Sequence, residues 1–130
     1  MASALAMMHW LGQIDGNDIE FVLAAPNTDR ESLTGQAAVV SNILGDHSMW
    51  ILDFDCCKKM SMDIAGVNQA VTAFLRNDPY YPRPDSSKEI WAAFRDNYLW
   101  VSDRILRQHI RNENQIEILP RTFIEKIEAS

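Results

Sequence analysis

Three prolines, Pro79, Pro82 and Pro84, place the strongest constraint on how this chain folds. Proline lacks a backbone N–H and clashes with the preceding helical turn, so no helix runs through this segment. Apolar residues recur at helical spacing on both sides of it, from Ser61 to Asp78 and from Ser86 to His109. The prolines therefore predict a stiff connector between two amphipathic helices.

Each of these helices has a predicted start and a predicted buried stripe. Ser61 is the expected N-cap of the first helix, and the segment from Ser86 to Glu89 reads as a capping box for the second. The residues expected to be buried are Ile64, Val67, Val71, Phe74 and Leu75 in the first helix, and Ile90, Phe94, Tyr98, Val101 and Ile105 in the second.

Two shorter apolar runs predict β-strands. Residues 19–23 alternate between apolar and polar positions, whereas the run from Trp50 to Phe54 is apolar without alternation, which is typical of a strand covered on both faces. We expect the two runs to pair in a small sheet with a long intervening loop. Between them, residues 37–44 fit either a strand or a helical turn, and residues 45–47 read as a turn.

Both ends of the chain also predict regular structure. Ser3 can cap a short helix to Leu11, with Leu5 and Met8 on its apolar face. Near the C-terminus, residues 116–119 suggest a short strand, and Pro120 can open a last helix that carries Phe123 and Ile127. The expected fold class is α+β, a small antiparallel sheet packed by several helices, in a single domain over residues 1–130.

Composition and charge exclude several classes of protein. The 130 residues are 47% hydrophobic, which suits one globular domain, and the net charge is −6, with six acids against Arg30 alone in residues 1–46. An acidic front segment repels a phosphate backbone, so we expect no nucleic-acid binding. No run is long and apolar enough to span a membrane, and the N-terminus lacks a secretory signal. We therefore expect an intracellular, cytoplasmic protein with reduced thiols at Cys56 and Cys57.

The segment Asp53-Phe54-Asp55 is the clearest chemical signal. Two carboxylates at the end of an apolar strand can hold a divalent cation. On this interpretation Asp53 is the main ligand of a weak Mg²⁺ or Mn²⁺ site, with Asn17 or Asp15 as the second ligand. Aspartate also ends strands for purely structural reasons, and both interpretations stay open.

One functional hypothesis is a small enzyme without a cofactor, or one assisted by a metal, of the isomerase, cyclase or hydrolase type. Its candidate acid and base groups are His9, Asp15, Asp53 and Asp55. An apolar cleft for a small apolar ligand would be lined by aromatic residues, namely Tyr80, Tyr81, Trp91 and Trp100. The alternative is that His9 and these aromatic residues are packing residues of the core.

Three segments together resemble an uncharacterised fungal domain family often labelled a zinc-finger protein. The segments are His9-Trp10 with residues 14–23, then Trp50 to Cys57, and then Phe74 to Pro84. The label is not matched by a ligand set in this chain. A structural zinc site needs four ligands, commonly in spaced Cys or His pairs, whereas the two cysteines are adjacent and the three histidines are scattered.

The order of these elements also resembles the C-terminal lobe of aminoglycoside- and choline-kinase-like proteins. There a helix leads into a His-containing loop, an Asn and a hairpin, and a later strand ends in the metal-binding Asp, here Asp53. In such a loop the catalytic Asp follows two residues after the His, a position that Leu11 occupies, and only eight residues precede His9 where an ATP-clamping lobe would lie. The resemblance therefore implies a pseudokinase-like binding or scaffold module without phosphotransfer activity.

A lobe that lacks its partner lobe should keep an apolar surface for another protein or a second copy. We expect a homodimer through Met7, Trp10 and Leu11, with the segment from Ile116 to Ile127 contributing. In the alternative, the C-terminal segment folds over the N-terminal helix of the same chain. A further alternative is that the chain is a fragment whose site is completed by an upstream part.

Overall fold

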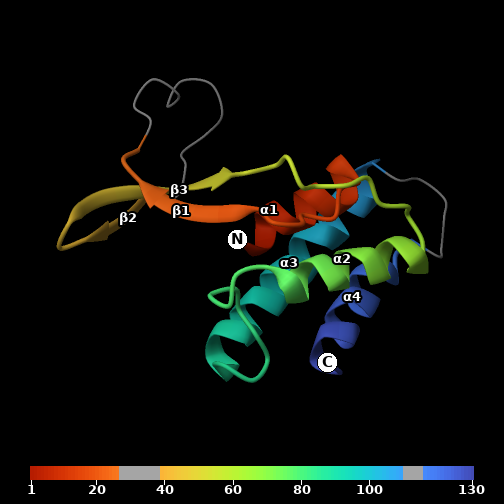
Figure 1. Ribbon diagram of the computed structural model, residues 1–130. Coiled ribbons are helices and arrows are strands. Elements are labelled where there is room, and N and C mark those ends of the chain that lie inside the picture. Colours follow the sequence, from red (N-terminus) through yellow and green to blue (C-terminus); the bar gives the residue numbers. More distant parts are fainter. Residues whose placement is uncertain (27–38, 110–115) are drawn as a thin grey trace. The chain divides into compact units, whose positions relative to one another are not determined.

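The computed structural model describes residues 1–26, 39–109 and 116–130 (Figure 1). It confirms the predicted α+β class, with helices and one three-stranded antiparallel sheet. The chain forms two compact units. We call residues 1–18 and 54–130 the helical unit and residues 19–53 the sheet unit. Among the described helices, none combines the length and the apolarity that crossing a membrane requires.

The helical unit is organised around its longest helix. A short helix passes directly into a π-helical turn at the N-terminus, and α3 packs against this first helix and against the last one, which in turn contacts α2. Figure 1 shows α2, α3 and α4 as neighbouring helices. The elements are α1 (Ala2–Met7), η1 (Met8–Gly12), α2 (Ile64–Arg76), α3 (Lys88–His109) and α4 (Leu119–Glu128).

Aromatic side chains form the core of this unit. The ring of Phe74 on α2 lies 5.7 Å from that of Phe123 on α4 and 5.5 Å from that of Phe94 on α3, measured between ring centroids. Tyr98 on α3 lies 5.0 Å from Phe123, so three helices meet at these rings. Burying large aromatic surfaces supplies most of the stabilisation available to a domain of this size.

The predicted stripes are confirmed at their centres and wrong at their edges. Ile64, Leu75 and Ile90 are exposed, because they lie at or near helix ends where no other described element covers them. The side chains that the structure buries as predicted are Val67, Val71, Phe74, Phe94, Tyr98 and Ile105, and Val101 is half-buried.

The caps differ in detail from the expected ones. Asp63, not Ser61, caps α2, since its Oδ1 accepts the Gly66 N–H at 2.9 Å while the Ser61 hydroxyl donates to the same oxygen at 2.6 Å. For α3 the Ser87 hydroxyl accepts the N–H of Ile90 at 3.4 Å. The expected cap at Ser3 is wrong, because α1 already begins at Ala2 without a side-chain cap.

The C-terminal segment contains a helix but no strand. Residues 116–118 form a turn, closed by a 3.1 Å hydrogen bond from the Leu119 N–H to the Ile116 carbonyl, so the strand predicted there is wrong. The helix predicted from Pro120 is confirmed as α4, with Phe123 and Ile127 buried.

The sheet unit contains β1 (Glu20–Ala24), β2 (Val39–Asn42) and β3 (Gly45–Leu52) in the order β1-β3-β2. The predicted pairing of the two apolar runs is confirmed, with Phe21 opposite Ile51. The ambiguous segment 37–44 contains strand β2, while its residues 37 and 38 lie outside the described part.

Two expectations about β3 are wrong. The chain reverses at residues 43 and 44, not at 45–47, because the Asn42 side chain accepts the Leu44 N–H at 2.8 Å and Gly45 takes a positive φ of 110°. Coverage on both faces does not occur either, since Ser48 is the one buried residue of β3. Antiparallel sheets do not need helices on both faces, which explains the difference.

We predict that Gly66→Ala destabilises the protein by about 3 kcal/mol, at the upper end of overpacking effects. A Cβ atom at this position would lie 1.8 Å from the backbone oxygen of Ser61, which cannot move without breaking the start of α2. Urea denaturation measures the effect. The control is Gly12→Ala, whose Cβ would lie 3.4 Å from the flexible Ile14 side chain and 3.8 Å from the Met7 carbonyl oxygen, both without a clash. Equal stability of the two variants would contradict the prediction.

Candidate functional site

His9 lies on the π-helical turn and is fully buried. Its ring is in edge contact with Trp10, Tyr98 and Phe123, and a 2.8 Å hydrogen bond joins its Nδ1 to the Tyr98 hydroxyl. Burial lowers the pKa of His9 to about 4, although the carbonyl and the carboxylate of Asp15 act in the opposite direction. The imidazole is therefore neutral at pH 7 and closed off from solvent.

A second buried hydrogen-bond chain fixes the same turn to α3. The Trp10 indole N–H donates to the Ser102 hydroxyl at 2.8 Å, and that hydroxyl donates to the Tyr98 carbonyl at 2.7 Å. Burial also raises the pKa of Tyr98 well above its usual value. Ser102 was not predicted from the sequence, where its signal is a lone polar residue four positions after Tyr98 on an otherwise apolar helix face.

Asp15 is buried, and both oxygens of its carboxylate accept hydrogen bonds. Oδ1 accepts the backbone N–H groups of Asn17 at 3.1 Å and Lys58 at 2.9 Å, and Oδ2 accepts the Gln69 amide at 2.8 Å. The Asp15 backbone N–H donates to the Lys58 carbonyl at 3.0 Å, next to a bridge between Ile14 and Lys59. The hydrogen bonds of Asp15 thus join residues 14–17 to residues 58–59 and to α2.

The predicted metal ligands are divided between the two units. Asn17 belongs to the helical unit, where its amide donates to the Cys56 carbonyl at 3.4 Å, and Asp53 ends the sheet unit. Asp55 belongs to the helical unit and is exposed. In the part of the chain that the structure describes, no three His, Cys, Asp or Glu side chains cluster as metal ligands do. The pairing of Asp53 with Asn17 stays a prediction.

The two cysteines are poorly suited to nucleophilic or metal chemistry. The charge of Asp55 is the main cause that raises the pKa of Cys56, and burial is the main cause that raises the pKa of Cys57. The Cys57 thiol donates to the Asn17 carbonyl at 3.6 Å. Because the thiolate is the nucleophilic form, these raised pKa values favour the unreactive thiol at both positions.

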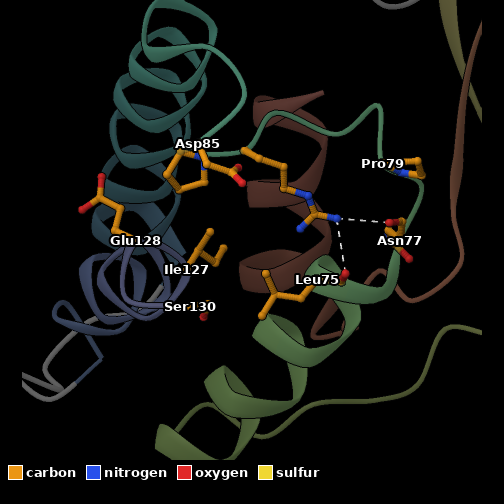
Figure 2. Close-up of a pocket in the computed structure, with 9 residues that line it drawn as sticks. Leu75, Asn77, Pro79, Asp85, Ile127, Glu128 and Ser130 are labelled. Carbon is orange, nitrogen blue, oxygen red and sulfur yellow. Dashed lines mark hydrogen bonds between the residues drawn. The ribbon is translucent and has the colours of Figure 1, made fainter.

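A cleft of about 590 Å³ lies within the helical unit, at the C-terminal ends of α2 and α4 (Figure 2). Arg83 lines it and caps α2, since its Nη2 donates to the carbonyls of Asn77 at 3.1 Å and Leu75 at 3.4 Å, the dashed lines in Figure 2. Its guanidinium carbon also lies 4.8 Å above the Phe74 ring. This cleft was not predicted from the sequence, because the proline and helix-end residues that form it carry no chemical motif.

The charges around this cleft do not favour an anionic ligand. Asp85 and Glu128 are its two carboxylates, and Arg83, its one cation, is already bonded to the end of α2. The residues lining it are Leu75, Asn77, Pro79, Arg83, Pro84, Asp85, Ile127, Glu128 and Ser130. A phosphate group would meet more negative than positive charge here.

The four aromatic residues expected to line a cleft do not do so together. Tyr81 and Trp91 are buried in the aromatic core, where each faces the Phe74 ring, and Tyr80 is almost fully exposed. Trp100 is exposed on α3 beneath the guanidinium of Arg104, 4.8 Å from the ring. The predicted small apolar ligand stays a prediction, because none of these four residues lines the 590 Å³ cleft.

Comparison with known protein families gives a match to part of the chain. The sequence model of a domain family described as "Zinc finger protein" matches residues 49–110, slightly less than half of the chain, which agrees with that part of the sequence resemblance. No curated protein matches. No solved structure matches either.

The described residues do not fit the zinc that this family description implies. Within the matched range, Cys56 is exposed and Cys57 is half-buried, and among the described residues no three His, Cys, Asp or Glu side chains cluster around them. His109 donates through its Nδ1 to the Ile105 carbonyl at 3.1 Å, at the far end of α3. A structural zinc site needs four converging ligands as thiolates or neutral imidazoles, and these groups do not form such a set.

We predict that His9 makes the stability depend on pH. Its pKa of about 4 in the folded state lies below the ordinary value of 6.5, so the unfolded chain binds the proton more tightly and stability falls as pH decreases between these values. Wild type should lose about 2 kcal/mol of unfolding free energy from pH 7 to pH 5 in excess of His9→Gln. Chemical denaturation at both pH values measures this loss. His47→Gln is the control and should behave as wild type, whereas parallel profiles of wild type and His9→Gln would contradict the prediction.

A weak cation site at Asp53 is tested by calorimetry with Mg²⁺ and Mn²⁺. We expect a dissociation constant of about 1 mM or weaker, and loss of binding in Asp53→Asn because one anionic ligand is removed. The substitution is mild, since Asp53 has a φ of 63° and Asn adopts this left-handed conformation readily. Identical heats for wild type and Asp53→Asn would remove the site, and Asp46→Asn serves as the control on the same unit.

Proposed function

We propose that this chain is a non-catalytic binding or scaffold module, as its kinase-like resemblance without a catalytic base implies. One observation carries the proposal: His9 and Asp15, two of the three candidate acid and base groups inside the helical unit, are both buried, and His9 Nδ1 and both carboxylate oxygens of Asp15 take part in internal hydrogen bonds. A general base must reach the proton that it removes from a substrate.

Phosphoryl transfer in particular has little support from the described residues. Leu11 occupies the position two residues after His9, where a kinase-like loop carries its base, and it is exposed. Asp15 is an acidic residue near this loop, and its carboxylate accepts hydrogen bonds from three N–H groups. The 590 Å³ cleft carries more carboxylates than cations, so it is a poor place for nucleotide phosphates. The alternative of a small enzyme would depend on Asp53 and Asp55 alone.

The proposed partner is a second copy of the chain or another protein. The apolar surface expected on the N-terminal helix is smaller than predicted, because Trp10 is buried. Among the large apolar residues of α1 and η1, only Met7 and Leu11 are exposed. The C-terminal segment covers the N-terminal turn of its own chain, with the Phe123 ring 5.0 Å from that of His9. A partner surface therefore has to be sought elsewhere on the chain.

We expect no phosphoryl transfer and no ATP affinity better than about 1 mM, because the described residues show neither a free base beside His9 nor a phosphate clamp. Thermal shift with magnesium-ATP and a phosphate-release assay measure both properties. Magnesium alone is the control, since it separates a metal effect from a nucleotide effect.

One outcome of this experiment would contradict the proposal. A stabilisation by magnesium-ATP that exceeds the magnesium control and disappears in Asp53→Ala would restore the kinase interpretation and overturn the proposed function.

A further inference from the structure

The cleft at the ends of α2 and α4 has the size of a small-molecule site and a largely apolar lining. Ligand pockets in proteins measure about 300–1,000 Å³, and apolar side chains line them together with a few polar groups. The volume here is about 590 Å³, and the apolar lining comes from Leu75, Pro79, Pro84 and Ile127. Leu75 is 41% exposed although its side chain is large and apolar. The cleft therefore has apolar surface that an alkyl group would cover.

The side-chain hydrogen-bond donors of this cleft are already in use. Figure 2 shows the Arg83 Nη2 donating to two carbonyls at the end of α2, and the Nη1 of the same residue is buried out of reach of a ligand. The Asn77 amide donates to the Gly16 carbonyl at 2.9 Å. The Ser130 hydroxyl donates to the Lys126 carbonyl at 2.6 Å. These side chains thus leave little donor capacity for an occupant that only accepts hydrogen bonds.

Negative charge and hydrogen-bond acceptors remain available. The C-terminal ends of α2 and α4 both lie at the cleft, and the carbonyl groups of a helix C-terminus carry a partial negative charge. Asp85 acts on the charge of Arg83 from a distance, but no ion pair joins its carboxylate to another described residue. Glu128 is partly neutralised, since its Oε1 accepts the Trp91 indole N–H at 2.9 Å and lies 3.7 Å from Arg95. The cleft therefore favours an occupant that brings a positive charge and several donors.

We propose that this cleft binds a primary alkylammonium group, with the ammonium at Asp85 and the helix carbonyls and the alkyl stem against Leu75 and the prolines. The inference rests on the proposed function and names the chemical class that the binding module takes. An ammonium group has three N–H donors, so it can reach a carboxylate and carbonyl oxygens together. Its stem can lie along apolar surface, as lysine stems do. A free amine and the lysine side chain of another protein both supply this chemistry.

Butylammonium is the probe, and the NMR chemical shifts of the backbone amides report where it binds. In wild type, the amides of residues 75–77 and 127–130 should shift with increasing butylammonium and reach saturation. Butyrate has the same chain length and the opposite charge, so it should leave these amides unchanged.

Two variants provide a matched test, because each removes one carboxylate charge. Asp85→Asn changes the cleft, whereas Glu125→Gln changes an exposed residue of α4 that does not line it. Asp85→Asn should weaken butylammonium binding about 5-fold, the size expected for one partly exposed ion pair. Glu125→Gln should bind as wild type does, which separates a local effect from the general attraction of a cation to a chain of charge −6.

A capped glycine–lysine–glycine peptide distinguishes the two sources of the ammonium group. Binding at least as tight as that of butylammonium, with the same amides shifted, assigns the cleft to a lysine of a protein partner. Binding of butylammonium without binding of the peptide assigns it to a free amine.

Absence of saturable shifts with butylammonium would overturn the inference, as would equal shifts with butyrate. Equal affinities of wild type and Asp85→Asn would overturn it too. The proposed function would survive these results, because a non-catalytic module can bind a partner elsewhere on its surface. It fails separately, if magnesium-ATP binding or phosphoryl transfer is found.

Discussion

The hydrogen bonds of the Asp15 carboxylate join the two segments of the helical unit that flank the sheet unit in the sequence. The chain departs after Asp18 and returns at Phe54, and Asp15 binds Lys58 and Gln69 on the returning side. Asn77 adds a second clamp, since its side-chain oxygen accepts the Asp18 N–H at 2.7 Å and its amide donates to the Gly16 carbonyl at 2.9 Å. A buried carboxylate is stable only when its oxygens are paired in this way.

These hydrogen bonds explain how the segments before and after the 35-residue sheet unit can share one aromatic helical core. Without them, ordering the two flanking segments next to each other would cost loop-closure entropy with little compensation. The buried chain from Trp10 through Ser102 to the Tyr98 carbonyl then fixes the N-terminal turn to α3. His9 and Asp15, two of the candidate acid and base groups, are therefore buried in these internal contacts.

The sequence predicts the elements of this fold better than its site. Helical periodicity placed α2 and α3, and the apolar runs placed the pairing of β1 with β3, because these signals are local. Burial and hydrogen-bond partners are not local: Asp15 finds its partners 43 and 54 residues away. The same limit explains why His9 and Asp15 suggested an acid and base pair, and why Ser102, Gln69 and the cleft at Arg83 were missed.

The two units solve the problem of apolar burial in different ways. In the helical unit, rings from α2, α3 and α4 bury one another, and internal hydrogen bonds pair His9 Nδ1 and both carboxylate oxygens of Asp15. In the sheet unit, three short strands have cross-strand contacts but bury few side chains. Local stability follows local burial, so the sheet is expected to open more readily than the aromatic core. A surface that gains stability when it is covered is suited to binding, whereas the sealed interior around His9 is not.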